Sequence, residues 1–283
     1  MFPASPTPPC RAASLPLSDG AGRPRPVGHP QTTVDRRNPF RIQRTSMMKF
    51  SDRKVFVVGG SRGMGAAIVR RFSAAGATVV FTYVASAEAA NQLAAETGAQ
   101  AVRADAGERE VLIASIRDAG PIDIFVYNAG LLVFGDPLTL VADDVDRMID
   151  VNVRGAYFGS VEASRMMPNG GRILVIGSNT ADNMPWPGLA AYVMTKAAMQ
   201  GMARGLTRDV GSRDITVNVI PPGPTDTDMN PAEGPRAASM LAPMAIKRYG
   251  TPDEVADLAL YLAGTQARGI TGSLHTIDGG FAA

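Results

Sequence analysis

The sequence is poor in cysteine, histidine and lysine, and it contains no apolar run long enough to cross a bilayer. Cys10 is its only cysteine, so no disulfide can form within the chain. A chain with so few thiols is typical of a reducing compartment, and we expect the protein to be cytoplasmic. The two histidines belong to no cluster with cysteine or carboxylates, so the sequence indicates no metal site.

The charges are unevenly distributed along the chain. Residues 1–46 hold seven arginines, no lysine and two acids, whereas the whole chain has 28 basic and 26 acidic residues. The remainder is therefore slightly acidic. This balance argues against a partner that is a nucleic acid polymer.

Residues 1–48 form a segment with its own composition. Nine of the 21 prolines lie within its first 46 residues, and few residues there could build a core. We expect the segment to be disordered. Its arginines leave open a targeting role, but we favour an upstream start codon, with true initiation at Met47 or Met48.

From residue 49 to residue 283 the sequence predicts a single α/β domain with a parallel sheet of the doubly wound, Rossmann type. Strand and helix patterns alternate, and about 235 residues suffice for one core. The expected strands, about seven, cover residues 55–58, 77–83, 101–105, 121–127, 172–177, 214–220 and 272–277. The expected helices cover residues 66–75, 87–97, 143–167, 190–211 and 251–263.

A glycine-rich loop follows the first expected strand. Gly59, Gly63 and Gly65 stand at G-x-x-x-G-x-G spacing, directly before a helix. Glycines in this setting let the backbone approach a pyrophosphate, which the helix N-terminus then attracts. A plain turn is the alternative, but the order of strand, loop and helix favours nucleotide binding.

The end of the second expected strand indicates which cofactor is bound. An NAD site usually has an acid there for the ribose 2′-hydroxyl. This chain has no acid between Tyr83 and Ser86, and the first one after them is Glu88. The absence favours NADP(H) over NAD(H), with Arg62 as the partner of the extra phosphate. The alternative for Arg62 is an ordinary solvated arginine.

Tyr192 and Lys196 are candidates for acid–base chemistry. Their spacing of four residues places both on one face of the helix expected at 190–211. A nearby ammonium lowers the pKa of a tyrosine from about 10, so that the pair can exchange a proton with an alcohol or carbonyl oxygen. Ser178, which follows the fifth expected strand, could hydrogen-bond the same oxygen. The pair alone also fits a surface lysine beside a core tyrosine. The choice between this alternative and acid–base chemistry therefore depends on the other motifs of the chain.

Two further stretches bear on the site. Asn152 lies in the middle of the helix expected at 143–167, either as a tolerated surface residue or as a polar group turned towards the site. Residues 221–247 are rich in proline and glycine and have little periodicity, which is typical of a mobile lid over a substrate.

With these motifs together, residues 49–283 resemble a classical short-chain dehydrogenase/reductase. Asn152, Ser178, Tyr192 and Lys196 match the catalytic tetrad of that family. The glycine loop also matches, although Val58 stands where the family usually has threonine. Asn128-Ala129-Gly130 matches an Asn-Ala-Gly element, with Tyr127 in place of the more usual asparagine. Ser178 precedes Tyr192 by fourteen positions rather than the common thirteen, which we expect to bulge the loop at 182–188.

The resemblance implies a function and a set of roles. It implies hydride transfer between NADP(H) and a carbonyl or secondary alcohol, with Tyr192 as general acid and base. Lys196 would bind the nicotinamide ribose and Asn152 would position a water. It also implies a homodimer or homotetramer formed through the helices at about 143–167 and 190–211. The implied cofactor contacts are Gly59, Ser61, Arg62, Gly63, Met64, Gly65, Tyr83, Ser86, Asp105, Asn128, Ala129, Gly130, Tyr192, Lys196, Pro222, Gly223 and Thr225.

Within the family, residues 59–72, 200–206, 226–232, 244–248 and 275–278 are similar to a bacterial group that binds cyclic di-GMP and promotes biofilm dispersal, and to 3-oxoacyl-carrier-protein reductases. The alternative function is therefore a cyclic-dinucleotide receptor, with Arg236, Lys247 and Arg248 as candidate phosphate ligands. Ordinary surface charge is the explanation that we favour for these three residues. A receptor needs no Tyr and Lys at tetrad spacing, so we favour catalysis.

Overall fold

The computed structural model describes residues 50–283, and the expectations for residues 1–48 lie outside that range. The described residues belong to one compact unit. Within them, none of the helices has the length and apolar composition needed to cross a bilayer.

The centre of the fold is a six-stranded parallel sheet with strand order β3-β2-β1-β4-β5-β6, which confirms the predicted α/β fold. The strands are β1 (Lys54–Val58), β2 (Thr78–Tyr83), β3 (Gln100–Arg103), β4 (Ile124–Tyr127), β5 (Arg172–Ile176) and β6 (Thr216–Ile220). Residues 272–277, expected as a seventh strand, contribute two isolated parallel bridges, from Leu274 to Val219 and from Ile277 to Pro222.

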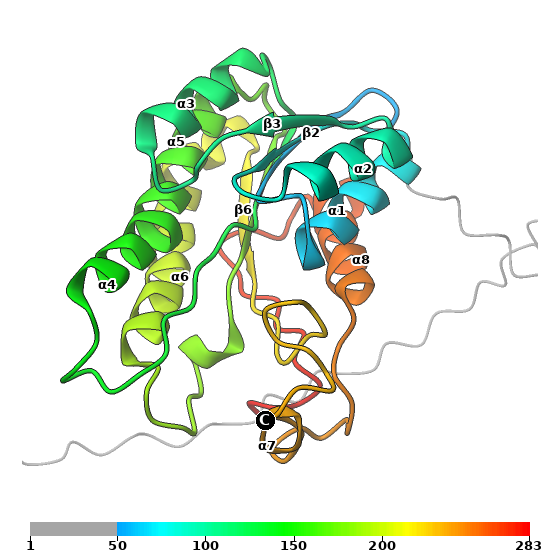
Figure 1. The fold of residues 1–283 in the computed structure, drawn as a ribbon. Helices are drawn as coiled ribbons and strands as arrows, with labels where there is room; N and C mark the ends of the chain where they lie inside the picture. The colour runs from blue at the N-terminus through cyan, green and yellow to red at the C-terminus, as the bar shows by residue number, and fades with distance from the viewer. Residues whose placement is uncertain (1–49) are drawn as a thin grey trace, which may run out of the picture. The chain divides into compact units, whose positions relative to one another are not determined.

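Helices cover both faces of the sheet (Figure 1). One face carries α1 (Gly63–Ala74), α2 (Ala87–Thr97) and α8 (Pro252–Ala263). The other carries α3 (Arg109–Asp118), α5 (Ala156–Met166) and α6 (Ala190–Val210). The short helix α7 (Ala237–Leu241) lies in the segment after β6.

The apolar alternation of the strands explains this layering. In β1, Val55 and Val57 pack under α1 and α8, while Phe56 and Val58 pack on the opposite face. A sheet buried on both faces needs apolar residues at every position, which is why the strands read as continuous apolar runs.

The helical stretch between β4 and β5 differs from the prediction of one long α-helix. It consists of α4 (Ala142–Ile149), a π-helical segment (Asp150–Gly155) and α5. A π-helical turn inside an α-helix commonly marks a functional site. Asn152 lies in this segment.

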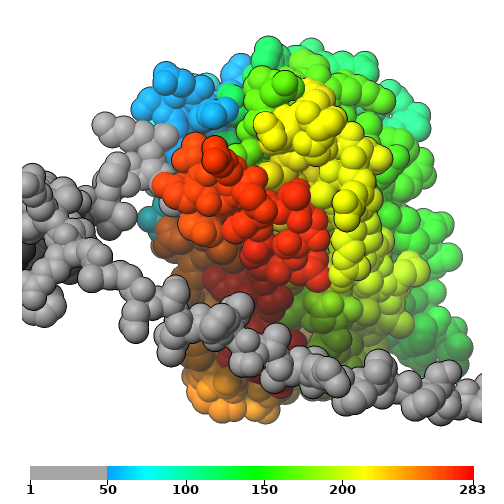
Figure 2. Space-filling model, turned by 180° about the vertical axis from the view of Figure 1, so that it is seen from behind, coloured from blue at the N-terminus to red at the C-terminus, as the bar shows by residue number. Residues whose placement is uncertain are grey.

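The residues after α8 pack beside the edge strand β6. Seen from behind, the residues after α8 lie against the end of α6 (Figure 2). The Thr207 hydroxyl is 3.0 Å from that of Thr271. This contact joins the last stretch of the chain to α6, and the Val217 N–H of β6 donates to the same Thr271 hydroxyl at 3.0 Å.

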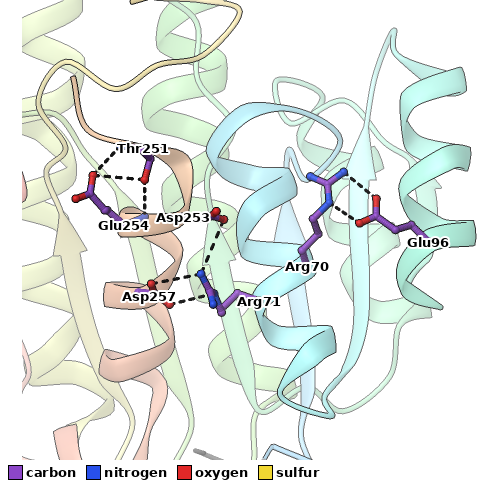
Figure 3. Close-up of polar contacts among 7 residues, drawn as sticks. All are labelled: Arg70, Arg71, Glu96, Thr251, Asp253, Glu254 and Asp257. Atoms are coloured by element: carbon purple, nitrogen blue, oxygen red, sulfur yellow. Dashed lines mark hydrogen bonds and ion pairs between the residues drawn. The ribbon is translucent and has the colours of Figure 1, made fainter. Parts of the chain in front are cut away.

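The start of α8 is fixed by a capping box (Figure 3). The Thr251 hydroxyl accepts a hydrogen bond from the Glu254 N–H at 3.3 Å, and the Glu254 carboxylate accepts one from the Thr251 N–H at 2.8 Å. Arg248 donates to the same carboxylate at 2.6 and 2.9 Å. These contacts hold the pKa of Glu254 at about 2, with the Arg248 hydrogen bond as the main cause.

We expect Thr251→Ala to lower the free energy of unfolding by about 0.5–2 kcal/mol, because the first turn of α8 loses its cap. Denaturant unfolding measures the change. Thr265→Ala is the matched control, since Thr265 is exposed and caps no α-helix. Equal effects of the two substitutions would contradict the role of the cap.

Candidate active site

The loop between β1 and α1 requires glycine for its conformation and for close contacts. Gly59 and Gly63 have φ angles of +77° and +51°, which are rare for other residues. A Cβ on Gly59 would lie 2.9 Å from the Ala129 Cα, and a Cβ on Gly65 would lie 2.1 Å from the Gly59 carbonyl oxygen. The loop therefore packs directly on the residues that follow β4.

The loop also presents the N-terminus of α1. Arg62 precedes the helix and makes no side-chain capping hydrogen bond. The first N–H groups of a helix have no intrahelical partners, and the helix dipole adds positive potential there. This end of α1 can therefore hold an anionic phosphate.

A cleft of about 420 Å³ opens beside the glycine loop at the carboxyl ends of β2, β3 and β4. Its lining includes most of the predicted cofactor contacts: Gly59, Ser61, Arg62, Gly63, Met64, Tyr83, Ser86, Asp105, Asn128, Ala129 and Gly130. Gly65, Tyr192, Lys196, Pro222, Gly223 and Thr225 are not part of this lining. The lining also includes residues that the sequence did not indicate, among them Arg147, Thr227, Asp228 and Met229.

Asn128 ties β4 to the glycine loop. Its Nδ2 donates to the Gly59 carbonyl at 2.7 Å. Its Oδ1 is buried and has no hydrogen-bond partner among residues 50–283. A free acceptor in the cleft wall suits a ligand hydroxyl. Together with the glycine cradle, it makes the cleft fit a dinucleotide.

Asp105 is held by Arg147, a partner that sequence reasoning missed. Arg147 Nη2 lies 2.7 and 2.6 Å from the two carboxylate oxygens, and the Gly107 N–H donates at 2.9 Å. Burial raises the pKa of Asp105, but the hydrogen bonds from Arg147 and Gly107 outweigh it and leave the pKa below its usual value. The two residues are 42 positions apart, so no local pattern indicates the pair.

The end of β2 has the composition that the sequence indicated. Tyr83 and Ser86 line the cleft, and the lining has no acid between them. Arg62 lies across the opening, with Nη1 3.7 Å from the Asp228 carboxylate. The 2′-end of a nucleotide in this cleft would therefore meet Arg62 rather than an acid of β2.

The tetrad adjoins the cleft at Gly130. A Cβ on Gly130 would lie 3.4 Å from the Lys196 Nζ and 3.6 Å from the Asn152 Oδ1. Lys196 is buried, donates to the Ile176 carbonyl at 3.1 Å, and has its Nζ 5.7 Å from the centre of the Tyr192 ring. Gly130, which also lines the cleft, therefore lies within van der Waals distance of both residues and marks where the cleft and the predicted tetrad meet.

Asn152 is fully buried, so the alternative of a surface asparagine is wrong. Its Nδ2 donates to the Leu131 carbonyl at 2.8 Å and to the Thr195 hydroxyl at 3.0 Å. Its Oδ1 accepts from the Leu131 N–H at 2.8 Å. The side chain thus fixes the loop after β4 against α6, and the π-helical turn places it there.

Tyr127, which stands where the family usually has asparagine, packs against the π-helical turn and supports it. It is fully buried, and its hydroxyl donates to the Val151 carbonyl, one residue before Asn152. Burial raises the pKa of Tyr127 far above its ordinary value, so the hydroxyl remains a donor. A Cβ on Gly155 would lie 2.3 Å from this hydroxyl, so the glycine makes room for the tyrosine.

The proton affinities of the tetrad differ from the expectation. Burial raises the pKa of Tyr192 to about 12, with the Ser178 hydroxyl opposing the rise. Burial also lowers the pKa of Lys196 to about 8. The expected lowering of the tyrosine pKa by Lys196 is absent because burial dominates, and because Lys196, with a pKa of about 8, has already lost its proton at the pH where Tyr192 ionises.

The segment after β6 lies next to Ser178. The Asn179 N–H donates to the Pro222 carbonyl at 3.0 Å, and the Thr225 hydroxyl donates to the Gly223 carbonyl at 3.0 Å. A Cβ on Gly223 would lie 2.6 Å from the Asp278 Cα. These contacts place the predicted nicotinamide segment beside the tetrad, outside the cleft described above.

The three cations considered for a cyclic dinucleotide are engaged with other groups. Arg248 pairs with Glu254 at 2.6 Å, and Lys247 donates to the Ala242 carbonyl at 2.9 Å. Arg236 lies 5.9 Å from the centre of the Phe134 ring. Each of the three cations therefore contacts a different group, and none of them lines the glycine-loop cleft.

Comparison with known protein families identifies the family to which this chain belongs. Residues 58–282 match the family model described as enoyl-(acyl carrier protein) reductase. The chain belongs to the short-chain dehydrogenase/reductase family. It is accordingly an oxidoreductase of the NAD(P)-dependent class, as the tetrad and the glycine loop predicted.

This chain covers nearly the whole length of the relatives that it matches. The cyclic-di-GMP-binding biofilm dispersal mediator protein of Escherichia coli K12 is 54% identical over 84% of this chain and 100% of its own. The crystal structure of BdcA in complex with NADPH is 55% identical, with a TM-score of 0.82 over 83% of this chain and 96% of that one. A short chain dehydrogenase from Burkholderia cenocepacia J2315 in complex with NADP is 41% identical, with a TM-score of 0.82 over 83% of this chain and 100% of that one.

We expect Tyr127→Phe to lower the free energy of unfolding by about 1–3 kcal/mol, because the Val151 carbonyl loses a buried donor. Denaturant unfolding measures the loss. Tyr261→Phe is the control, since Tyr261 lies on α8 and is 43% exposed. A loss no larger than in the control would show that the buried hydroxyl does not support the π-helical turn.

We expect Lys196→Met to raise the free energy of unfolding at pH 7 by roughly 1–3 kcal/mol, since it removes a buried ammonium. The folded-state pKa of about 8 lies below the ordinary 10.5, so the unfolded chain binds more protons between these values and wild-type stability rises with pH there. The gain should therefore shrink between about pH 8 and pH 10. Unfolding at several pH values measures it, and a gain independent of pH would refute the shifted pKa.

Proposed function

We propose that the protein catalyses hydride transfer between NADP(H) and a carbonyl or secondary alcohol, with reduction of the carbonyl as the favoured direction. The observation that carries the proposal is the junction at Gly130, where the nucleotide cleft and the buried tetrad meet. When bound, the cofactor supplies the hydride or accepts it.

The residues that would hold the cofactor are those of the cleft and of the segment after β6. The N-terminus of α1 would receive the pyrophosphate, Asn128 and Asp105 the adenosine half, and Arg62 the 2′-phosphate. Pro222, Gly223 and Thr225 would hold the nicotinamide carboxamide. The related structures that contain NADPH and NADP support this assignment.

In reduction, the Tyr192 hydroxyl donates its proton to the carbonyl oxygen as the carbonyl carbon gains the hydride. Because its pKa is about 12, Tyr192 is protonated at neutral pH and ready to donate. Ser178 donates a hydrogen bond to the same oxygen while charge develops on it. Lys196, whose pKa is about 8, then returns a proton to Tyr192 and takes one from solvent.

In this proposal Asn152 positions other groups and does not itself react. Its amide holds Leu131 and Thr195, and the remaining lone pair of its Oδ1 would bind the water that passes protons to Lys196. The Thr195 hydroxyl donates to the Tyr192 carbonyl at 2.7 Å. Asn152 is therefore joined to the backbone of the tyrosine that donates the proton.

A second candidate function is cyclic-dinucleotide binding, because the E. coli relative is named for it. The surface cations Arg236, Lys247 and Arg248 are engaged elsewhere, so the glycine-loop cleft is the better place for its phosphates. Cyclic di-GMP should then compete with NADPH. Binding of both ligands at once would exclude this cleft.

A homodimer or homotetramer and a cytoplasmic location stay predictions. The helical stretch from α4 to α5 and helix α6 are the surfaces through which we expect subunits to associate. Sedimentation of the full chain would give the number of subunits.

We expect Tyr192→Phe to lower kcat by at least about 10²–10⁴, because the proton donor to the carbonyl oxygen is lost. NADPH affinity should remain within about twofold of wild type. Steady-state kinetics on a panel of aldehydes and ketones, with NADPH binding measured by its fluorescence, separates the two effects.

Tyr261→Phe serves as the matched control, since Tyr261 is exposed on α8, away from the site and from the expected subunit surfaces. A Tyr192→Phe variant with wild-type turnover would contradict the assignment of the proton donor.

A further inference from the structure

The segment after β6 places a carboxylate at the mouth of the nucleotide cleft. Asp228 Oδ2 lies 3.7 Å from Arg62 Nη1, and the two side chains are 73% and 61% exposed. Its neighbour Thr227 packs on the glycine loop, where a Cβ on Gly63 would lie 3.2 Å from the Thr227 Cγ2. Asp228 is therefore part of the cleft wall and faces the cation across it.

Arg62 is the cation of the cleft that a ligand can recruit. Among the described residues that line the cleft, the cations are Arg62 and Arg147. Arg147 is held at 2.6 and 2.7 Å by Asp105, a partly buried carboxylate. A ligand phosphate would leave that carboxylate unpaired if it took Arg147. The looser, exposed pair of Arg62 and Asp228 opens at little cost.

We propose that Asp228 sets how strongly the protein prefers NADPH over NADH, by competing with the 2′-phosphate for Arg62. This inference rests on the proposed function. The 2′-phosphate distinguishes the two cofactors and carries between one and two negative charges near neutral pH. To reach Arg62 it must displace the carboxylate, which then repels it. NADH has only a hydroxyl at this position and is little affected.

The size of the effect follows from the exposure of the pair. Exposed ion pairs contribute so little that losing the competitor should change affinity by about two- to fivefold. Salt screens charges over about 10 Å at 0.1 M and about 3 Å at 1 M. The effect of Asp228 should therefore be largest in dilute buffer and vanish at high salt.

The test measures Kd for NADPH and for NADH, by fluorescence of the reduced nicotinamide, with the full chain and no substrate. The variants are Asp228→Asn, Arg62→Ala and the double variant. Asp228→Asn should tighten NADPH binding by about two- to fivefold at about 0.05 M salt and leave NADH binding unchanged. The gain should disappear at about 1 M salt and in the Arg62→Ala background.

Glu96→Gln provides the matched control. Glu96 pairs with Arg70 at 2.8 and 2.9 Å, with side chains 48% and 49% exposed, on the surface formed by α1 and α2 (Figure 3). It removes the same kind of charge from the same kind of pair, away from the cleft lining. The ratio of its Kd values for NADPH and NADH should match that of the wild type. A gain in NADPH affinity equal to that of Asp228→Asn would show that the effect comes from net charge alone.

The outcomes separate this inference from the proposed function. If Arg62→Ala lowers the preference for NADPH but Asp228→Asn leaves it unchanged or lowers it, the competition by Asp228 is refuted and the proposed function stands. If Arg62→Ala also leaves the preference unchanged, the assignment of Arg62 to the 2′-phosphate fails, and the inference fails with it.

Discussion

The site depends on one buried amide. Asn152 spends both of its Nδ2 donors and one lone pair of its Oδ1 on the Leu131 backbone and on Thr195, so it joins the loop after β4 to α6. The loop carries the cofactor side of the site and α6 carries Tyr192 and Lys196. An amide with satisfied hydrogen bonds at a buried position rigidifies the groups that it joins. Asn152 therefore fixes the distance between the cofactor side of the site and the helix that carries Tyr192 and Lys196.

The same region shows how the π-helical turn is held in place. A π-helical turn interrupts the stretch from α4 to α5 and turns Asn152 inward, and the Tyr127 hydroxyl satisfies the Val151 carbonyl beside it. Gly155 leaves room for that hydroxyl. Gly155, four residues after Val151, thus accommodates the bulky tyrosine that packs beside Asn152.

Sequence periodicity predicted the parallel sheet, because buried strands read as apolar runs and the helices between them have amphipathic spacing. The glycine loop before α1 and the placement of Tyr192 and Lys196 on one helix were also predictable, since glycine geometry and residue spacing are local properties. The π-helical turn was not, because tertiary hydrogen bonds to Leu131 and Thr195 decide it. Arg147 and Asp228 were missed for the same reason, since each meets its partner only after the chain has folded.

The pKa of Tyr192 shows the limit of reasoning from spacing alone. Spacing places Lys196 near the ring but does not report the burial of both groups, which raises the pKa of the tyrosine and lowers that of the lysine.

The most direct test of the proposed hydride transfer follows the hydride itself. NADPH carrying deuterium at the transferable C4 position is incubated with the full chain and a panel of carbonyl compounds, and the alcohols are analysed by mass spectrometry. The account predicts one deuterium on the carbinol carbon of at least one product, formed faster with NADPH than with NADH. Tight cyclic di-GMP binding with no labelled alcohol from any member of the panel would contradict it.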